Sequence, residues 1–439
     1  MGKLSRRTFL KIIGTTASAG AVRLLAPGLL LGSAAACQTA PAEPTAGALA
    51  SATSTAAPTT AAAQSATQAA SATAAPTAQV AAPTVASMQP LNVGARVVHV
   101  HSDAATNWGG QVGYWDYVDQ RTVTQMVERG VTELTGQSTV ADAWRALLPG
   151  YMPGKAVAIK VNFNNTLSGD CGVVGGEINA LPQPVAAVIA GLKAAGVDER
   201  DVWIYDGVDR FIPAYFTAAI PFGGVQYFDR CHNRVDYYSS QDGTAIVQFN
   251  LPAGVPAPAP QRVADLLTRA SYLINMPIMK SHTCASITLG FKNHFGSIDN
   301  PGGVHSHVFM VPGCGGTLYP DYNPLIDIYR NPHIGGKTVI TIGDALFAVK
   351  GGQDSSPRTW STFGGALPNS LFFALDPVAI DSVMADFLRA EPSAGVYAGA
   401  DDYLRLAQDA GLGVFERGDP WGAGYEVIDY RKIELSSTF

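Results

Sequence analysis

The chain has 439 residues, of which 15% are charged, and its formal net charge is −6 at pH 7. The first 37 residues carry basic side chains and no acidic ones, so the remainder is more acidic than the whole. An acidic chain with few charges is unsuited to binding nucleic acid or to electrostatic adhesion to a membrane surface.

The start of the chain predicts export. Arg6 and Arg7 stand in the run Ser-Arg-Arg-Thr-Phe-Leu-Lys, which matches a twin-arginine signal, and a moderately apolar stretch follows at residues 12–31. Arg23 interrupts this stretch, which makes it a poor membrane span but a suitable apolar region for a signal peptide. We therefore expect the twin-arginine translocase to be a partner of this protein.

The end of the predicted signal suggests a lipid anchor. The small residues Ser-Ala-Ala-Ala precede Cys37, which can carry the lipid of a lipoprotein. Acyl chains on one cysteine hold a protein at a membrane without a spanning helix. Cleavage at an Ala-x-Ala site without lipidation is the alternative. Residues 1–37 are thus expected to be a signal peptide, and the protein is expected at the outer face of the cytoplasmic membrane or in the periplasm.

A tether is predicted next, at residues 38–90, which are almost all Ala, Thr, Ser, Pro and Gln. Such a segment buries too little apolar surface to offset its chain entropy. As a flexible coil of about fifty residues it would span roughly 40 Å. It would connect the membrane anchor to a single globular domain at residues 91–439.

The globular part alternates strand and helix patterns. Residues 156–162 and 202–205 are apolar strands, and a helix from Pro184 to Ala195 connects them, which makes a βαβ unit with a parallel pair. Further strands are expected at 225–228, 245–250, 272–275, 337–342, 371–375 and 425–435, and further helices at 262–270, 377–389 and 402–410. This pattern predicts an α/β fold with a mostly parallel sheet, helices on both faces and irregular insertions.

Four cysteines follow Cys37, namely Cys171, Cys231, Cys284 and Cys314. An even number in an exported chain allows two disulfides, in any of three pairings, and free thiols or a single disulfide are the alternatives. The sequence contains no Cys-x-x-Cys pair. An iron–sulfur cluster held by this chain alone is therefore not expected.

Polar side chains gather where the predicted strands end, and open parallel sheets bind ligands beyond the carboxyl ends of their strands. Lys160 stands inside an apolar strand, where a lysine needs a partner or a shifted pKa. We expect four residues to bind a small anionic ligand: Lys160, Asn162, Lys292 and Asn293. The expected catalytic residues are His282, Lys280, Asp344 and Asp381. In this interpretation His282 is the acid/base or a metal ligand, and one of the two aspartates orients it.

A divalent metal ion is a second expectation. His305 and His307 are spaced to lie on one side of an extended segment, and His294 precedes them. Together with His294 or an aspartate, these two imidazoles could complete a metal site. The alternative interpretation is a polar loop over the pocket.

The order of several motifs resembles the family called domain of unknown function 362. The matching segments are 159–162, the helix ending at Gly196 before the strand that precedes Asp206-Gly207, 275–282, 288–296, 376–381 and 403–413. The resemblance covers about residues 155–415 and implies an α/β domain, sometimes joined to ferredoxin-type iron–sulfur modules. It implies no established activity.

Two classes of function therefore stand out. The first is an exported, tethered enzyme that acts on a small anionic molecule with a bound metal or cofactor. The second is a lipoprotein that captures a metabolite or metal ion without turnover. A purely structural surface protein is disfavoured, because so many polar groups at the strand ends would be unfavourable in a core that binds no ligand.

Overall fold

The computed structural model describes residues 91–166, 171–172, 174–207, 209–235, 242–392 and 394–436. The expected signal peptide, Cys37 and the tether lie outside these residues. Residues 83–439 form one compact unit. In the described part of this unit, no helix is both long and apolar enough to cross a membrane.

The described residues build one ten-stranded sheet, and its core is parallel. The strands are β1 (Arg96–His101), β2 (Val157–Lys160), β3 (Val202–Tyr205), β4 (Gln226–Phe228), β5 (Tyr272–Asn275), β6 (Ile278–His282), β7 (Ser286–Thr288), β8 (Thr338–Val349), β9 (Ser370–Ala374) and β10 (Asp429–Glu434). Their order is β10-β1-β9-β8-β5-β2-β3-β4, and β6 pairs with both β8 and β7. Only the β1–β9, β8–β9 and β6–β7 pairs in this sheet are antiparallel. The predicted mostly parallel α/β fold is confirmed.

Helices connect these strands. The α-helices are α2 (Gln120–Thr135), α3 (Val140–Leu147), α4 (Pro182–Ala194), α5 (Ala214–Ala219), α6 (Asp265–Arg269), α7 (Gly290–Asn293), α8 (His305–Val308), α9 (Pro324–Arg330), α10 (Pro377–Ala390) and α11 (Gly399–Asp409). Short 3-10 helices are η1 (Asp103–Ala105), η2 (Tyr114–Tyr117), η3 (Glu199–Asp201), η4 (Gly243–Ala245), η5 (His294–Ser297), η6 (Pro301–Val304) and η7 (Ser361–Phe363).

Local sequence explains where the longer helices begin. The Asp119 carboxylate accepts a hydrogen bond from the Thr122 amide at the start of α2. The Asp376 carboxylate does the same for two amides at the start of α10, where proline occupies the first turn. Such caps satisfy amides that have no partner inside the helix, and each contributes about 1 kcal/mol.

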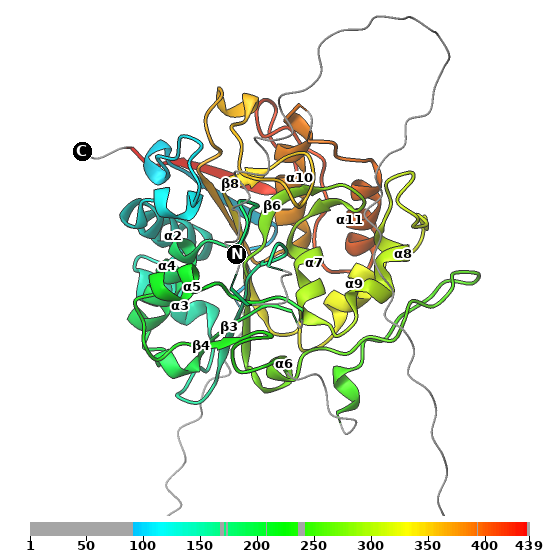
Figure 1. Cartoon of the computed structure of the whole chain (residues 1–439), viewed down its shortest axis with the longest axis horizontal. Coiled ribbons are helices and arrows are strands. Elements are labelled where there is room, and N and C mark those ends of the chain that lie inside the picture. Colours follow the sequence, from blue (N-terminus) through cyan, green and yellow to red (C-terminus); the bar gives the residue numbers. More distant parts are fainter. Residues whose placement is uncertain are drawn as a thin grey trace, which may run out of the picture. The chain divides into compact units, whose positions relative to one another are not determined.

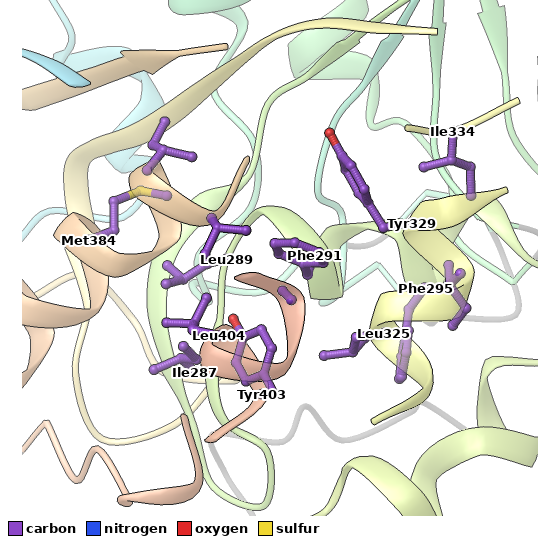
Figure 2. Close-up of a cluster of buried hydrophobic side chains, with 14 of the residues drawn as sticks. Ile287, Leu289, Phe291, Phe295, Leu325, Tyr329, Ile334, Met384, Tyr403 and Leu404 are labelled. Atoms are coloured by element: carbon purple, nitrogen blue, oxygen red, sulfur yellow. The ribbon is translucent and has the colours of Figure 1, made fainter. Parts of the chain in front are cut away.

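The helices form a layer on each face of the sheet (Figure 1). Helices α2, α3, α4 and α5 pack together on one face, and α2 contacts β1 and β9. On the other face α10 contacts β1, β8 and β9, and it packs against α7 and α11. Side chains alternate along each strand, so Val157 and Ile159 belong to the first core and Ala158 to the second. Figure 2 shows the second core, where Phe291, Tyr329 and Tyr403 meet between α7, α9 and α11.

The order of strands reverses between β2 and β5. The chain proceeds from β2 to β3 and β4 on one side, and then returns to place β5 on the opposite side of β2. Connections that leave two adjacent strands in opposite directions open a crevice at their carboxyl ends. The topology therefore predicts a ligand site beyond the ends of β2 and β5, where Lys160 and Asn275 stand.

Two disulfides join the four cysteines. Cys171 is bonded to Cys231 and Cys284 to Cys314, with Cα–Cα distances of 6.3 and 5.5 Å. The sequence had left three pairings open. The second bridge joins the turn between β6 and β7 to the segment between α8 and α9, and Cys284 lies two residues beyond His282.

Two predicted strands differ from those observed. Residues 245–250 form no strand; η4 ends at Ala245, and Ile246 makes a single bridge to Arg262. β8 continues past Gly343, where we had expected it to end. Gly343 is paired in the sheet with Phe372, and a Cβ atom there would lie 2.4 Å from the Met384 sulfur. This glycine permits close packing of α10 on the strand and does not make a turn.

Candidate functional site

Three adjacent strands deliver polar side chains to the same face. Lys160, the last residue of β2, is in register with Asn275 of β5 and with Tyr205 of β3. All three are on the face that carries α7, because Ala158, Leu273 and Tyr205 contribute to the core there. The buried polar cluster is thus a direct consequence of strand register.

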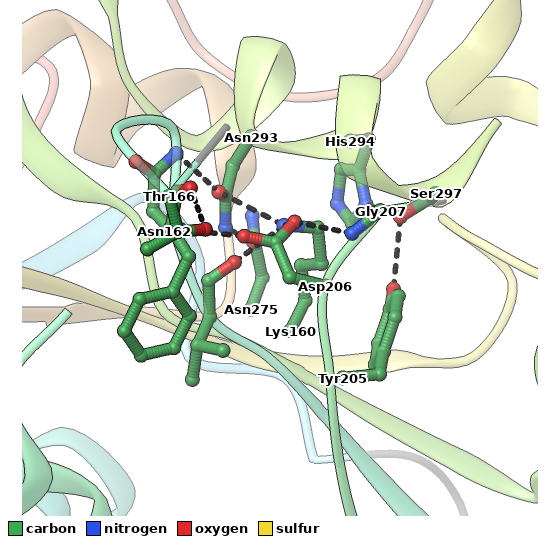
Figure 3. Close-up of polar contacts among 12 residues, drawn as sticks. Lys160, Asn162, Thr166, Tyr205, Asp206, Gly207, Asn275, Asn293, His294 and Ser297 are labelled. Carbon is green, nitrogen blue, oxygen red and sulfur yellow. Dashed lines mark hydrogen bonds and ion pairs between the residues drawn. The ribbon is translucent and has the colours of Figure 1, made fainter. Parts of the chain in front are cut away.

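Lys160 forms a buried ion pair with Asp206, the residue that follows β3 (Figure 3). The lysine Nζ lies 2.7 Å from the aspartate Oδ1, and the two side chains are 1% and 5% exposed. The other carboxylate oxygen accepts from the Phe163 amide at 2.5 Å. Burial lowers the pKa of Lys160, and the charge of Asp206 opposes that shift. Lys160, which was expected to bind ligand, thus has a carboxylate partner within the protein.

Two glycines make room for this pair. A Cβ atom on Gly296 would lie 2.2 Å from the Asp206 Oδ1 and 2.6 Å from the Lys160 Nζ. A Cβ atom on Gly207 would lie 3.1 Å from the Gly296 Cα. Backbone therefore covers the ion pair directly and excludes water from it, which strengthens the attraction and makes an unpaired charge there costly.

Amide side chains continue the network away from the ion pair. The Asn275 Nδ2 donates to the Gly290 carbonyl at 3.0 Å, and its Oδ1 accepts from the Asn293 Nδ2 at 2.8 Å. The Asn293 Oδ1 accepts from the Asn162 Nδ2 at 3.0 Å, and the Asn162 Oδ1 accepts from the Lys280 Nζ at 2.9 Å. A backbone carbonyl can only accept a hydrogen bond, so the Gly290 carbonyl fixes which end of each side-chain amide in this series donates and which accepts. An acceptor oxygen therefore faces Lys280.

Lys280 differs from Lys160 in lacking a carboxylate partner. It is completely buried on β6, and its one hydrogen bond within the described residues goes to Asn162. Burial lowers the pKa of Lys280 to about 7, although the charges of Asp354 and Asp206 raise it somewhat. A substantial fraction of this side chain is therefore a neutral amine near neutral pH.

His282, two residues further along β6, is held as a neutral donor. Its Nδ1 accepts from the amides of Cys284 and Ala285 at 3.1 and 3.0 Å. The proton of the neutral ring is therefore on Nε2, which has no partner among the described residues. Burial, followed by the charges of Lys292 and Lys280, holds the pKa of His282 far below its usual value. These contacts suit a hydrogen-bond donor better than the expected acid/base.

Lys292 and Arg210 complete a cationic group. The Lys292 Nζ lies 4.3 Å from the centre of the Phe295 ring, and burial, then the charges of Lys280 and Arg210, lower its pKa to about 7. Arg210 is only 19% exposed, and it pairs at 3.1 Å with the half-exposed Asp209. Its charge acts on the pKa of Lys280 and Lys292. Sequence analysis missed Arg210. The available signal was its position in the loop that follows β3, at the carboxyl edge of the sheet.

The two expected catalytic aspartates do not contact His282. The Asp381 carboxylate accepts from the Gly290 amide at 2.7 Å and the Phe291 amide at 3.1 Å, so it anchors the start of α7. Asp344 lies within β8 and accepts from the Leu346 amide. Burial raises the pKa of both carboxyls to about 7. Neither carboxyl forms a hydrogen bond with His282 among the described residues, so the structure does not show the orienting role predicted for one of them.

The three expected metal ligands have separate contacts. The His294 Nδ1 is 3.1 Å from the Ser297 hydroxyl, and the His307 Nε2 is 2.8 Å from the Pro256 carbonyl. His305 stacks on Phe309 with ring centres 4.5 Å apart. Within the described ranges, no three His, Cys, Asp or Glu side chains gather closely enough to hold a metal ion.

The chain shows similarity to a described protein family and to a solved structure. No curated protein matches the chain. A crystal structure of a Thermotoga maritima protein from the Northeast Structural Genomics Consortium matches with 12% identity and a TM-score of 0.36, over 66% of this chain and 59% of the other. The family model described as domain of unknown function (DUF362) matches residues 157–386, just over half of the chain, from β2 into α10. The chain therefore belongs to the domain of unknown function 362 family.

Proposed function

We propose that this protein is an exported, membrane-tethered enzyme that acts on a small anionic molecule. The observation that supports this proposal is the cationic group, which we define as Lys280, Lys292 and Arg210. Lys280 and Lys292 form no ion pair with a carboxylate among the described residues. A buried cation without a partner is unfavourable, and an anionic ligand would relieve that cost.

The surrounding groups suit an oxyanion. The His282 Nε2 offers a hydrogen-bond donor, and both lysines offer several. The charge of Asp354 acts on the pKa of both lysines. This carboxylate is exposed, and it accepts a hydrogen bond from the side-chain Nδ2 of Asn164 at 3.1 Å. A small carboxylate or phosphate would find donors on several sides, and charge-assisted bonds of this kind are about twice as strong as neutral ones.

The cationic group also supports catalysis rather than capture alone. A lysine whose pKa lies near 7 can accept a proton or attack a carbon atom, which an ordinary lysine at neutral pH does poorly. The non-catalytic alternative would use the same donors. Tight anion binding by a protein with no turnover of any small anion would favour that alternative.

We expect Lys292→Met to weaken anion binding by at least about tenfold, because the variant removes one charge from the cationic group. Oxalate and inorganic phosphate are suitable probes, titrated into the protein by calorimetry at low salt. The control is Lys155→Met, since Lys155 precedes β2 and lies at the opposite end of that strand from Lys160. Equal affinities for wild type, Lys292→Met and Lys155→Met would contradict the proposed site.

Export through the twin-arginine translocase is a separate part of the proposal, and it rests on the sequence. Replacing Arg6 and Arg7 together by lysine is expected to retain the protein in the cytoplasm, because the translocase recognises the guanidinium pair. Immunoblots of fractionated cells would show the redistribution. Unchanged export of the double variant would contradict the twin-arginine signal.

A further inference from the structure

Lys280 has surroundings suited to covalent chemistry. We infer that the Lys280 Nζ forms an imine with the carbonyl carbon of a small 2-oxo acid, whose carboxylate is held by Lys292 and Arg210. This inference rests on the proposed function and specifies its substrate class.

The contacts of Lys280 support a neutral amine. A buried ammonium has three protons that need acceptors, whereas the described residues supply one, the Asn162 oxygen at 2.9 Å. Lys160 shows the contrasting arrangement in the same cluster, because Asp206 neutralises it and the Val161 carbonyl accepts from it as well. Lys160 is thus occupied by protein groups, whereas Lys280 keeps donor positions for which the described residues supply no acceptor.

The chain of amides also orients the amine. The Gly290 carbonyl accepts from the first amide of the series, and this fixes the orientation of each amide that follows. As a result, the Asn162 oxygen faces Lys280. An acceptor at that position binds one N–H and so directs the lone pair of a neutral amine elsewhere. The lone pair is therefore available for attack on an electrophilic carbon. The lowered pKa of Lys280, about 7, agrees with this geometry.

The neighbouring groups match the rest of a 2-oxo acid. Arg210, whose charge acts on the pKa of both lysines, and Lys292, which is protonated in part near pH 7, suit the carboxylate. His282 carries its proton on Nε2 and so suits the carbonyl oxygen as a hydrogen-bond donor. Polarising that oxygen makes the adjacent carbon more electrophilic.

The reaction is balanced without any other reagent. The amine nitrogen adds to the carbonyl carbon, and one N–H proton passes to the carbonyl oxygen, which gives a carbinolamine. Loss of the second N–H proton together with the hydroxyl group, as one water molecule, leaves the C=N bond. Nearby positive charge favours this chemistry because it keeps the attacking amine deprotonated.

The test is reductive trapping. The full-length protein is incubated with pyruvate and sodium cyanoborohydride, which delivers hydride to the imine carbon and leaves a stable secondary amine. Peptide mapping by mass spectrometry should locate the adduct on Lys280 of the wild type. Lys280→Met should lose that adduct, and Lys155→Met should keep it. An adduct confined to other lysines, or no adduct at all, would overturn the inference.

Calorimetry with oxalate separates this result from the proposed function, because oxalate resembles the anion but forms no imine. Oxalate binding without a Lys280 adduct would leave the anion site standing and reject the imine. A Lys280 adduct without oxalate binding would support the amine nucleophile and reject the anion site. Failure of both measurements would reject both proposals.

Discussion

Replacing Asp206 by asparagine is expected to destabilise the folded protein by about 3–5 kcal/mol, the usual cost of removing one partner from a buried ion pair. The substitution preserves shape but leaves the ammonium of Lys160 without its counter-charge, in a place that backbone shields from water. It also weakens the acceptor of the Phe163 amide. Urea unfolding followed by circular dichroism would measure the change in unfolding free energy.

Asp402→Asn is the matched control for this prediction. Asp402 also forms an ion pair, at 3.0 Å from Arg405, but its side chain is 36% exposed and that of Arg405 is 54% exposed. Pairs of this kind contribute about 0–1 kcal/mol because water screens them. If Asp206→Asn destabilised the protein no more than Asp402→Asn does, the buried pair would not be the structural centre of the site.

Lys280→Met is expected to abolish binding of oxalate while leaving the protein at least as stable as the wild type at pH 7. Burial lowers the folded-state pKa of Lys280 from 10.5 to about 7, so the unfolded chain holds a proton there that the folded protein gives up. The side chain therefore opposes folding, fully below about pH 7 and progressively less as pH rises toward 10. Methionine has a similar length and carries no charge, so it removes this cost.

The lowered pKa of Lys280 can be tested by measuring how the unfolding free energy changes with pH. Between about pH 7 and 10 the unfolded state binds more protons at this position, so the unfolding free energy of the wild type should rise with pH. The contribution of one such group approaches about 1.4 kcal/mol per pH unit. Lys280→Met should show a smaller rise by about that amount, and Lys155→Met should follow the wild type. Parallel curves for all three proteins would contradict the lowered pKa.

The titration of Asp344 and Asp381 does not interfere with measuring the effect of Lys280 on the unfolding free energy. Burial raises the folded-state pKa of both carboxyls to about 7, so the folded protein binds their protons more readily than the unfolded chain does. Their effect is stability that falls as pH rises from about 4 to 7. The lysine effect occupies a separate window above pH 7, and differences between variants isolate it.

The sequence by itself determined the elements and the kinds of side chain at their ends. Strands at 202–205 and 272–275 were predicted with their observed bounds, because short apolar runs with turn residues after them identify buried parallel strands. The sequence also identified Lys160, which stands in an apolar strand, and the Lys280–His282 pair. Polar groups of this kind are unfavourable in a core unless they have a partner or a ligand.

Only the tertiary structure decided which of these side chains meet. Asp206 looks like a turn residue in sequence, but the parallel register of β2 and β3 makes it the partner of Lys160. Asp381 looked catalytic, but α10 directs it to the amides of α7. The physical reason is that partners here are separated by tens of residues, 46 for the first pair and 91 for the second. Local patterns indicate which groups need a partner, while strand order and helix packing determine the partner itself.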